Sequence, residues 1–207
     1  MISDRHRAIF IHIQKSGGNS VRAALGGALK DPRKHWTARE LRATMSADTW
    51  ARYFKFAVVR NPWARMVSWW RMAERARAKF DRGEKVAVLA RTALARARTF
   101  DQFLQRMDDD LTNPDGYRWN MWRNQIDYLE DQDGVLLVDF VARTETLAAD
   151  FERIRERLAA PADGLPHANA ARVRVDYRDY YNPSQADLIG NRFARDIAYF
   201  GYRFGES

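Results

Sequence analysis

The chain has 207 residues, 46% of them hydrophobic and 13% aromatic, and a net charge of +8. This length and composition predict a compact globular protein, taken here as a single domain over residues 1–207. The absence of cysteine excludes disulfides and thiol chemistry, and the four histidines are too scattered for a zinc cluster. With no signal peptide and no long apolar run, we expect a cytoplasmic protein without a transmembrane segment.

Three short apolar runs predict buried strands. The first two are residues 8–13 (AIFIHI) and 54–59 (FKFAVV), and each leads into a turn and then a helical pattern. The third is 134–141 (GVLLVDFV), after which Thr144 is expected to cap another helix. Strands that alternate with helices predict an α/β fold with a central parallel sheet, helices on both faces, and ligands at the carboxyl ends of the strands.

A long helical pattern occupies residues 64–107. It is broken near Asp81-Arg82-Gly83 and restarts after Thr99, which predicts two or three helices. One apolar face is expected at Val86, Leu89, Ala93 and Leu94. The Arg-rich part, 71–98, is interpreted as a solvated surface. Contact of this part with an anionic glycan or with a membrane surface is left open.

The last third of the chain contains a loop and a final helix. Residues 159–168 are rich in Pro and Gly, which predicts a loop. Asn182-Pro183 then predicts the start of a helix that runs to about Phe200, since Pro is favoured in the first helical turn.

The turn after the first strand has the composition of an anion site. A helix begins there, and its first N–H groups have no partners within the helix. Glycine lets the backbone approach a phosphate closely, small polar side chains add donors, and a lysine supplies a positive charge. The residues concerned are Lys15, Ser16, Gly17, Gly18, Asn19 and Ser20. The lysine precedes both glycines, so this is neither GxxxxGK[ST] nor GxGxxG.

The turn after the second strand offers a second anion-binding group. Arg60 is expected at the end of the strand, Asn61 as the helix cap and Pro62 at the first helical position. Ser68 lies about two turns into that helix, whereas Arg65 is interpreted as a structural ion-pair partner. Two such turns in one sheet suggest a ligand with two separated phosphate groups, such as a nucleotide phosphorylated at both ends.

These motifs resemble those of sulfotransferases that use 3′-phosphoadenosine 5′-phosphosulfate (PAPS). FIHIQKSGGNS is similar to the 5′-phosphosulfate loop and RNPWARMVS to the 3′-phosphate motif of the family that contains the heparan sulfate 6-O- and 2-O-sulfotransferases. The resemblance implies a P-loop-like sulfotransferase fold and sulfuryl transfer to a hydroxyl, less readily an amine, of an acceptor. A carbohydrate such as an anionic glycan is the acceptor we expect, and a lipid, a peptide tyrosine and a small metabolite are left open. Lys15 to Ser20 would hold the 5′ end of PAPS, and Arg60 and Ser68 its 3′-phosphate.

The same resemblance suggests the catalytic groups. Lys15 would stabilise the transferring group without a metal, because a sulfuryl group carries less charge than a phosphoryl group. His35, in KHWTARELR, matches a histidine that the family often has between the two motifs, and it is the candidate base. His12 is interpreted as a core histidine. His167 is placed in a loop, and no nucleotide contact is assigned to residues 167–174.

Two other functions would account for part of this pattern. A metal-dependent nucleotide kinase is disfavoured by the position of the lysine and by the lack of a clear pair of Mg²⁺-binding carboxylates. A basic nucleic-acid-binding module would explain the charge and the aromatic content, but it would not need two phosphate-binding turns. The partner we expect is therefore an acceptor substrate and not a nucleic acid.

Overall fold

The computed structural model describes residues 1–27, 31, 33–84, 97–105, 121–159 and 175–206. The contacts divide the chain into two compact units, one made of 1–61 and 124–174 and the other of 62–123 and 175–206. The expected single domain over 1–207 remains a prediction, and each unit is described separately below. The predicted apolar face at residues 86–94, and His167 with the loop that follows it, lie outside the described residues.

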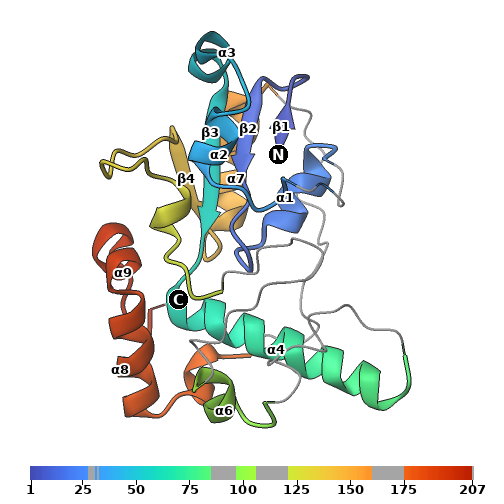
Figure 1. Cartoon of the computed structure of the whole chain (residues 1–207), viewed down its shortest axis with the longest axis vertical. Helices are drawn as coiled ribbons and strands as arrows, with labels where there is room; N and C mark the ends of the chain where they lie inside the picture. Colours follow the sequence, from blue (N-terminus) through green and yellow to red (C-terminus); the bar gives the residue numbers. More distant parts are fainter. Residues whose placement is uncertain (28–30, 32, 85–96, 106–120, 160–174, 207) are drawn as a thin grey trace. The chain divides into compact units, whose positions relative to one another are not determined.

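The first unit is built on a four-stranded sheet of order β1-β2-β3-β4 (Figure 1). Strands β2 (Ala8–Ile11), β3 (Phe54–Val59) and β4 (Phe140–Arg143) are parallel, and Phe10 pairs with Phe56. The predicted parallel sheet is confirmed for these three strands. The two-residue edge strand β1 (Ile2–Ser3) was not predicted and runs antiparallel to β2.

The third strand begins later than the sequence predicts. Residues 131–135 form a turn instead, because the carboxylate of Asp131 accepts hydrogen bonds from the N–H groups of Asp133 (3.0 Å) and Val135 (2.9 Å). Leu136 makes an isolated bridge with Glu130. The strand therefore starts only at Phe140, and the prediction of a strand over 134–141 was wrong for its first six residues.

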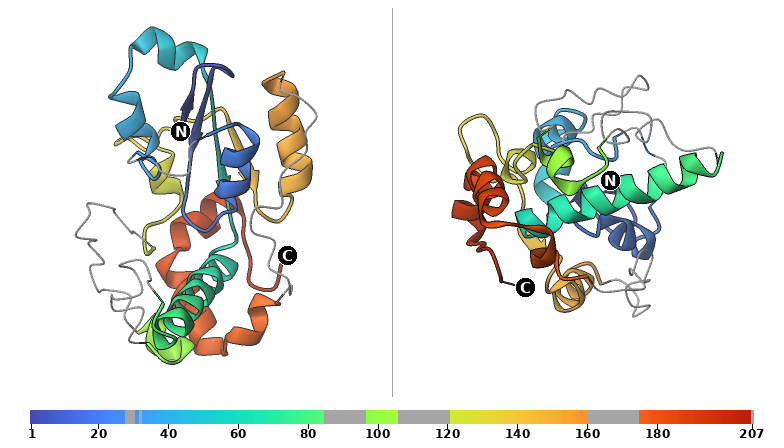
Figure 2. Two further views of the ribbon diagram at one scale, coloured as in Figure 1. Left: turned by 90° about the vertical axis from the view of Figure 1, so that its right-hand side faces the viewer. Right: turned by 90° about the horizontal axis from the view of Figure 1, so that it is seen from below.

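Helices cover the sheet of the first unit on both faces. Helices α1 (Gly18–Ala24) and α7 (Leu147–Arg157) pack on one face and bury Val21, Phe151 and Ile154 against Phe10 and Phe56. Helix α2 (Ala38–Arg42) lies on the opposite face, and α3 (Ala47–Arg52) lies near the start of β3. The left view in Figure 2 shows helices on both sides of this sheet. The short 3₁₀ helix η2 (Ile126–Tyr128) also belongs to this unit.

The second unit contains α4 (Pro62–Asp81), α6 (Phe100–Leu104), η3 (Tyr177–Tyr180), α8 (Pro183–Arg192) and α9 (Ala194–Phe200). Three local predictions are confirmed: α4 begins at Pro62, a helix restarts after Thr99, and another begins at Asn182-Pro183. The structure adds that Thr99 caps α6 and that Asn182 forms a capping box with Gln185. The single helix predicted from 183 to about 200 is wrong, because it is interrupted at Phe193. The side chain of Phe193 is fully buried under the guanidinium of Arg65, which lies 5.7 Å from its ring.

Candidate functional site

The loop between β2 and α1 has the backbone of an anion cradle. Lys15 has a φ of 68° and Gly17 a φ of 82°, so both lie in the left-handed region, which few residues other than glycine adopt readily. Gly17 is followed directly by the right-handed helical residue Gly18. Alternation of left- and right-handed residues turns successive N–H groups toward one point, and this is how backbone nests bind anions. The loop therefore has a conformation that suits the predicted phosphate contact.

Ser16 has a structural task within this loop. Its side chain is fully buried, and its hydroxyl donates to the main-chain oxygen of Ile13 at 2.8 Å. Its own carbonyl accepts a hydrogen bond of 2.9 Å from the hydroxyl of Thr144. The Ser16 side chain thus closes the turn, which leaves the backbone N–H as the group by which it would contact a nucleotide.

Gly18, Asn19 and Ser20 form the first turn of α1. The N–H of Ser20 donates to the Gly17 oxygen at 3.1 Å. The side-chain oxygen of Asn19 is buried and has no hydrogen-bond partner among the described residues. A polar atom in that condition is costly unless a ligand or water satisfies it. This observation fits a bound group that offers hydrogen bonds at the start of the helix.

Arg60 lies beside the loop, directly after β3. One of its terminal nitrogens, Nη1, donates to the carbonyl oxygen of Lys15 at 3.3 Å, and both side chains are half-buried. The structure therefore brings together the two turns that the sequence assigned to separate phosphate groups. A lysine ammonium and a guanidinium at the same edge of the sheet make a strongly cationic position.

Gln125 holds the main chain of Arg60. Its amide nitrogen donates to the Arg60 carbonyl at 2.8 Å, and its amide oxygen accepts from the Arg60 N–H at 2.9 Å. The Gln125 side chain is fully buried. Sequence reasoning did not find this residue. It lies 65 positions from its partner, and a glutamine before an apolar run carries no recognisable signal.

The turn between β4 and α7 ties the strand ends together. The N–H of Thr144 donates to the Val59 oxygen at 2.8 Å, and its hydroxyl lies within hydrogen-bond distance of the oxygens of Ser16 and Val59. The carboxylate of Glu145 accepts from the N–H of Asn61 at 2.8 Å. The predicted helix cap at Thr144 is therefore wrong: α7 begins at Leu147 and Thr146 precedes it. Thr144 instead links the loop to β3.

His35 is held against His12. Its Nδ1 lies 2.9 Å from the main-chain oxygen of His12, and the two ring centroids are 4.8 Å apart. A carbonyl oxygen only accepts hydrogen bonds, so Nδ1 carries the proton and Nε2 carries the lone pair. Burial is the main cause that lowers the pKa of His35 from 6.5 to about 4, and the nearby charges of Lys34 and Arg22 lower it further.

In this environment His35 is not an ordinary solvated imidazole with a pKa near 6.5. The ring is neutral at physiological pH, as a base requires, but its conjugate acid is stronger than that of a solvated histidine. Burial also holds the pKa of His12 well below its ordinary value, so both rings are neutral.

Two further residues of the second motif lie in the second unit. Ser68 is half-buried on α4, and its proposed contact with a nucleotide stays a prediction. Arg65 is fully buried, donates to the carbonyl of Arg123 at 3.1 Å, and packs over Phe193. Its contacts support the structural role that the sequence suggested.

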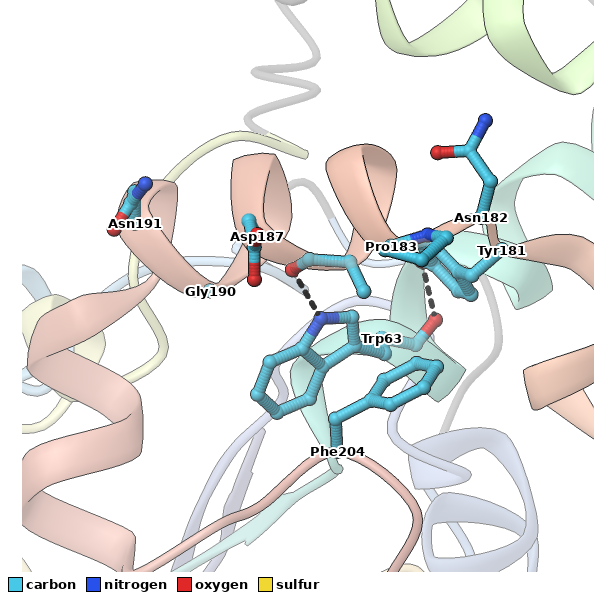
Figure 3. A pocket seen from close by; sticks show the side chains of 9 residues that line it. Trp63, Tyr181, Asn182, Pro183, Asp187, Gly190, Asn191 and Phe204 are labelled. Atoms are coloured by element: carbon cyan, nitrogen blue, oxygen red, sulfur yellow. Dashed lines mark hydrogen bonds between the residues drawn. The ribbon is translucent and has the colours of Figure 1, made fainter.

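The second unit also has a pocket of about 590 Å³ between α8 and the C-terminal segment (Figure 3). Trp63 forms its floor and donates from its indole nitrogen to the Ala186 carbonyl at 2.8 Å, and Phe204 packs on Trp63. The hydroxyl of Tyr181 donates to the Trp63 carbonyl at 3.0 Å. Of the residues that line this pocket, none is a predicted site residue.

Together these features define a class of protein: an α/β fold in which the loop after the first parallel strand has the backbone of an anion cradle. A model of the Sulfotransferase family matches residues 1–203, and the chain belongs to that family. This confirms the predicted enzyme class, a PAPS-dependent sulfotransferase, over the kinase and the nucleic-acid-binding module.

Among solved structures, the chain is similar to one described as the crystal structure of mouse sulfotransferase SULT7A1 complexed with PAP. The two share 14% sequence identity with a TM-score of 0.54, over 94% of this chain and 85% of that chain. At this identity the likeness establishes the fold, and it confirms the predicted P-loop-like α/β architecture. A search of curated proteins gave no match.

Two further features are absent from the described part of the chain. In this part of the chain, no three His, Asp or Glu side chains are grouped so as to hold a metal ion. The described helices also include none that is both long enough and apolar enough to span a membrane. The expectation that the enzyme needs no metal remains a prediction.

Proposed function

We propose that this sulfotransferase moves a sulfuryl group from PAPS to a hydroxyl of a carbohydrate acceptor, with the nucleotide held at the edge of the first unit where β2 and β3 end. The observation that carries this proposal is the hydrogen bond from Arg60 to the carbonyl of Lys15, because it joins the two anion-binding turns. The acceptor class rests on the resemblance to carbohydrate sulfotransferases, and the cytoplasmic location stays a prediction.

Each residue of the proposed nucleotide site has a distinct task. The N–H groups of Ser16, Gly17 and Gly18 would hold the 5′ end of the nucleotide, with the amide of Asn19 and the hydroxyl of Ser20 beside them. Arg60 and Ser68 would bind the 3′-phosphate. When bound, PAPS supplies the sulfuryl group that the acceptor receives. The ammonium of Lys15 would balance the negative charge that develops between the nucleotide and the acceptor during transfer, which is electrostatic catalysis.

His35 is proposed as the general base. The bond from Nδ1 to the His12 carbonyl fixes the tautomer in which Nε2 can accept the proton of the acceptor hydroxyl. Removal of that proton makes the oxygen a better nucleophile, and the proton remains on the imidazole until solvent takes it. Burial keeps the ring neutral and ready to accept over the physiological range.

The proposed function is tested by binding and by turnover. Product nucleotide, 3′-phosphoadenosine 5′-phosphate (PAP), should raise the melting temperature in the presence of EDTA, because a ligand bound only by the native state stabilises it. Radiolabelled PAPS should transfer label to one of a set of glycans and small alcohols, and mass spectrometry should show the added sulfuryl group. Tighter binding of ATP than of PAP, or binding that needs Mg²⁺, would contradict the proposed donor site.

A further inference from the structure

His12 is a polar residue in an apolar place. Its side chain is 4% exposed at the end of β2, and its ring stacks on Phe10 with centroids 5.4 Å apart. The Nδ1 atom is buried and has no hydrogen-bond partner among the described residues. Leaving such an atom unsatisfied costs roughly 1–3 kcal/mol, a cost that a leucine or phenylalanine would avoid. The imidazole therefore calls for an explanation beyond packing.

On one side the ring of His12 touches the nucleotide loop. A β-carbon on Gly18 would lie 2.4 Å from Cδ2 and 2.5 Å from Nε2 of His12, far inside van der Waals contact. Gly18 is the first residue of α1, so the edge of this ring sets how closely the start of the helix approaches β2. Only glycine allows that approach.

On the other side His12 holds His35. Its carbonyl accepts the Nδ1–H of His35 at 2.9 Å, and its ring meets the His35 ring edge-on, at an interplanar angle of 60°. Lys34 and Arg22 are cations that act on both rings. A single residue thus contacts both the loop proposed for the donor and the group proposed to activate the acceptor.

We propose that His12 is a positioning residue that couples the phosphate loop to the candidate base, His35, by filling the space between Gly18 and the His35 ring. This inference rests on the proposed function for the role of His35 as the base. The coupling itself is a structural relation, and it can be measured without turnover. His12 touches no reacting atom and acts only through these two neighbours.

The first experiment measures the tautomer and the pKa of His35 by NMR in protein labelled with ¹⁵N-histidine. In the wild type we expect the Nδ1–H tautomer and a low pKa. His12→Ala should let water reach the His35 ring, and since burial is the main cause of the low value, the pKa should rise toward 6.5. Ile11→Val is the control, because Ile11 is buried, ends β2 directly before His12, and by the alternation of side chains along the strand lies on the face opposite to that of Phe10. It should lower stability without moving the His35 titration.

The second experiment tests the contact with the loop. Gly18→Ala should weaken PAP binding at least tenfold, because its methyl group collides with the His12 ring. The double variant His12→Ala/Gly18→Ala should recover at least threefold of that loss, since the ring is gone. Recovery should be partial, because Phe10 would also lie 3.0 Å from the new β-carbon.

The outcomes separate the two proposals. A His12→Ala protein whose His35 keeps its wild-type tautomer and pKa, or a double variant no better than Gly18→Ala, would overturn the coupling. If the NMR shift appears and the double variant recovers, the coupling holds. Unchanged kcat for both His12→Ala and His35→Ala would then reject His35 as the base and leave the His12 contacts in place.

Discussion

Gln125→Ala should weaken nucleotide binding because it releases the backbone of Arg60, although Gln125 itself need not touch the nucleotide. The side chain is fully buried and makes two hydrogen bonds, of 2.8 and 2.9 Å, to the carbonyl and the N–H of Arg60. Alanine removes both bonds and leaves two main-chain groups without these partners. The backbone of Arg60 would then be less rigid, so the direction of its guanidinium would no longer be fixed.

The magnitude follows from those two bonds. Arg60 is half-buried, so each lost bond should cost about its net worth of roughly 0.5–1.5 kcal/mol, and the free energy of unfolding should fall by about 1–3 kcal/mol. The affinity for PAP should fall nearly as far as in Arg60→Ala, because the contact is lost through its orientation. The double variant Gln125→Ala/Arg60→Ala should bind PAP no more weakly than Arg60→Ala alone, since residues that act as a unit are not additive.

Urea unfolding and calorimetric titration with PAP measure these two effects. Gln105→Ala serves as the matched control: Gln105 is exposed, it bonds to the side chain of Asp101, and its loss should change stability by less than about 0.5 kcal/mol. The reasoning fails if Gln125→Ala keeps wild-type stability and PAP affinity. It also fails if the double variant binds PAP additively more weakly.

Four further predictions follow from the site. Arg60→Ala should weaken PAP binding about tenfold to a hundredfold, the equivalent of a lost charge-assisted contact of roughly 1.5–3 kcal/mol, as calorimetry would show. Lys15→Ala should lower kcat more than it weakens PAP binding, as steady-state kinetics beside titration would show. His35→Ala should bind PAP normally yet lose roughly 10²–10⁴-fold in kcat. The free energy of unfolding of the wild type should fall by about 3 kcal/mol as the pH drops from 6.5 to about 4, because His35 takes up a proton more readily in the unfolded chain than in the folded one. Urea unfolding at a series of pH values measures this fall, and the contribution should be absent from His35→Ala.

The parts of the fold that the sequence predicted are those with local signals. Strands β2 and β3 are short apolar runs that end at polar turns, and α4 and α8 begin where Pro62 and Pro183 follow an asparagine. The Gly-containing turn after β2 was likewise predicted, because two adjacent glycines lie between an apolar run and a helical pattern. In each case the residues that determine the structure lie within a few positions of one another.

The parts that were missed depend on contacts between distant residues. Thr144 looks like a helix cap in sequence, yet its hydroxyl is 128 positions from its partner Ser16. The low pKa of His35 comes first from burial, which no local pattern reports. A helical pattern likewise gives no warning that Phe193 interrupts the final helix, because the interruption accompanies burial under Arg65. These details concern the support of the candidate site, whereas the residues proposed to face the ligand carry a local motif.

The position of Arg60 explains why an arginine suits this strand end better than a lysine. A guanidinium has five N–H donors in a rigid plane, and the bond to the Lys15 carbonyl uses one of them. The same side chain can therefore brace the loop and bind an anion in a forked geometry. A lysine at residue 60 would offer a point charge on a flexible side chain, and its single ammonium group would have to contact both the Lys15 carbonyl and the anion. In the proposed function Arg60 thus has two tasks, to brace the loop and to bind the anion. Gln125 holds the backbone of Arg60 itself, and Thr144 holds the backbone of the loop.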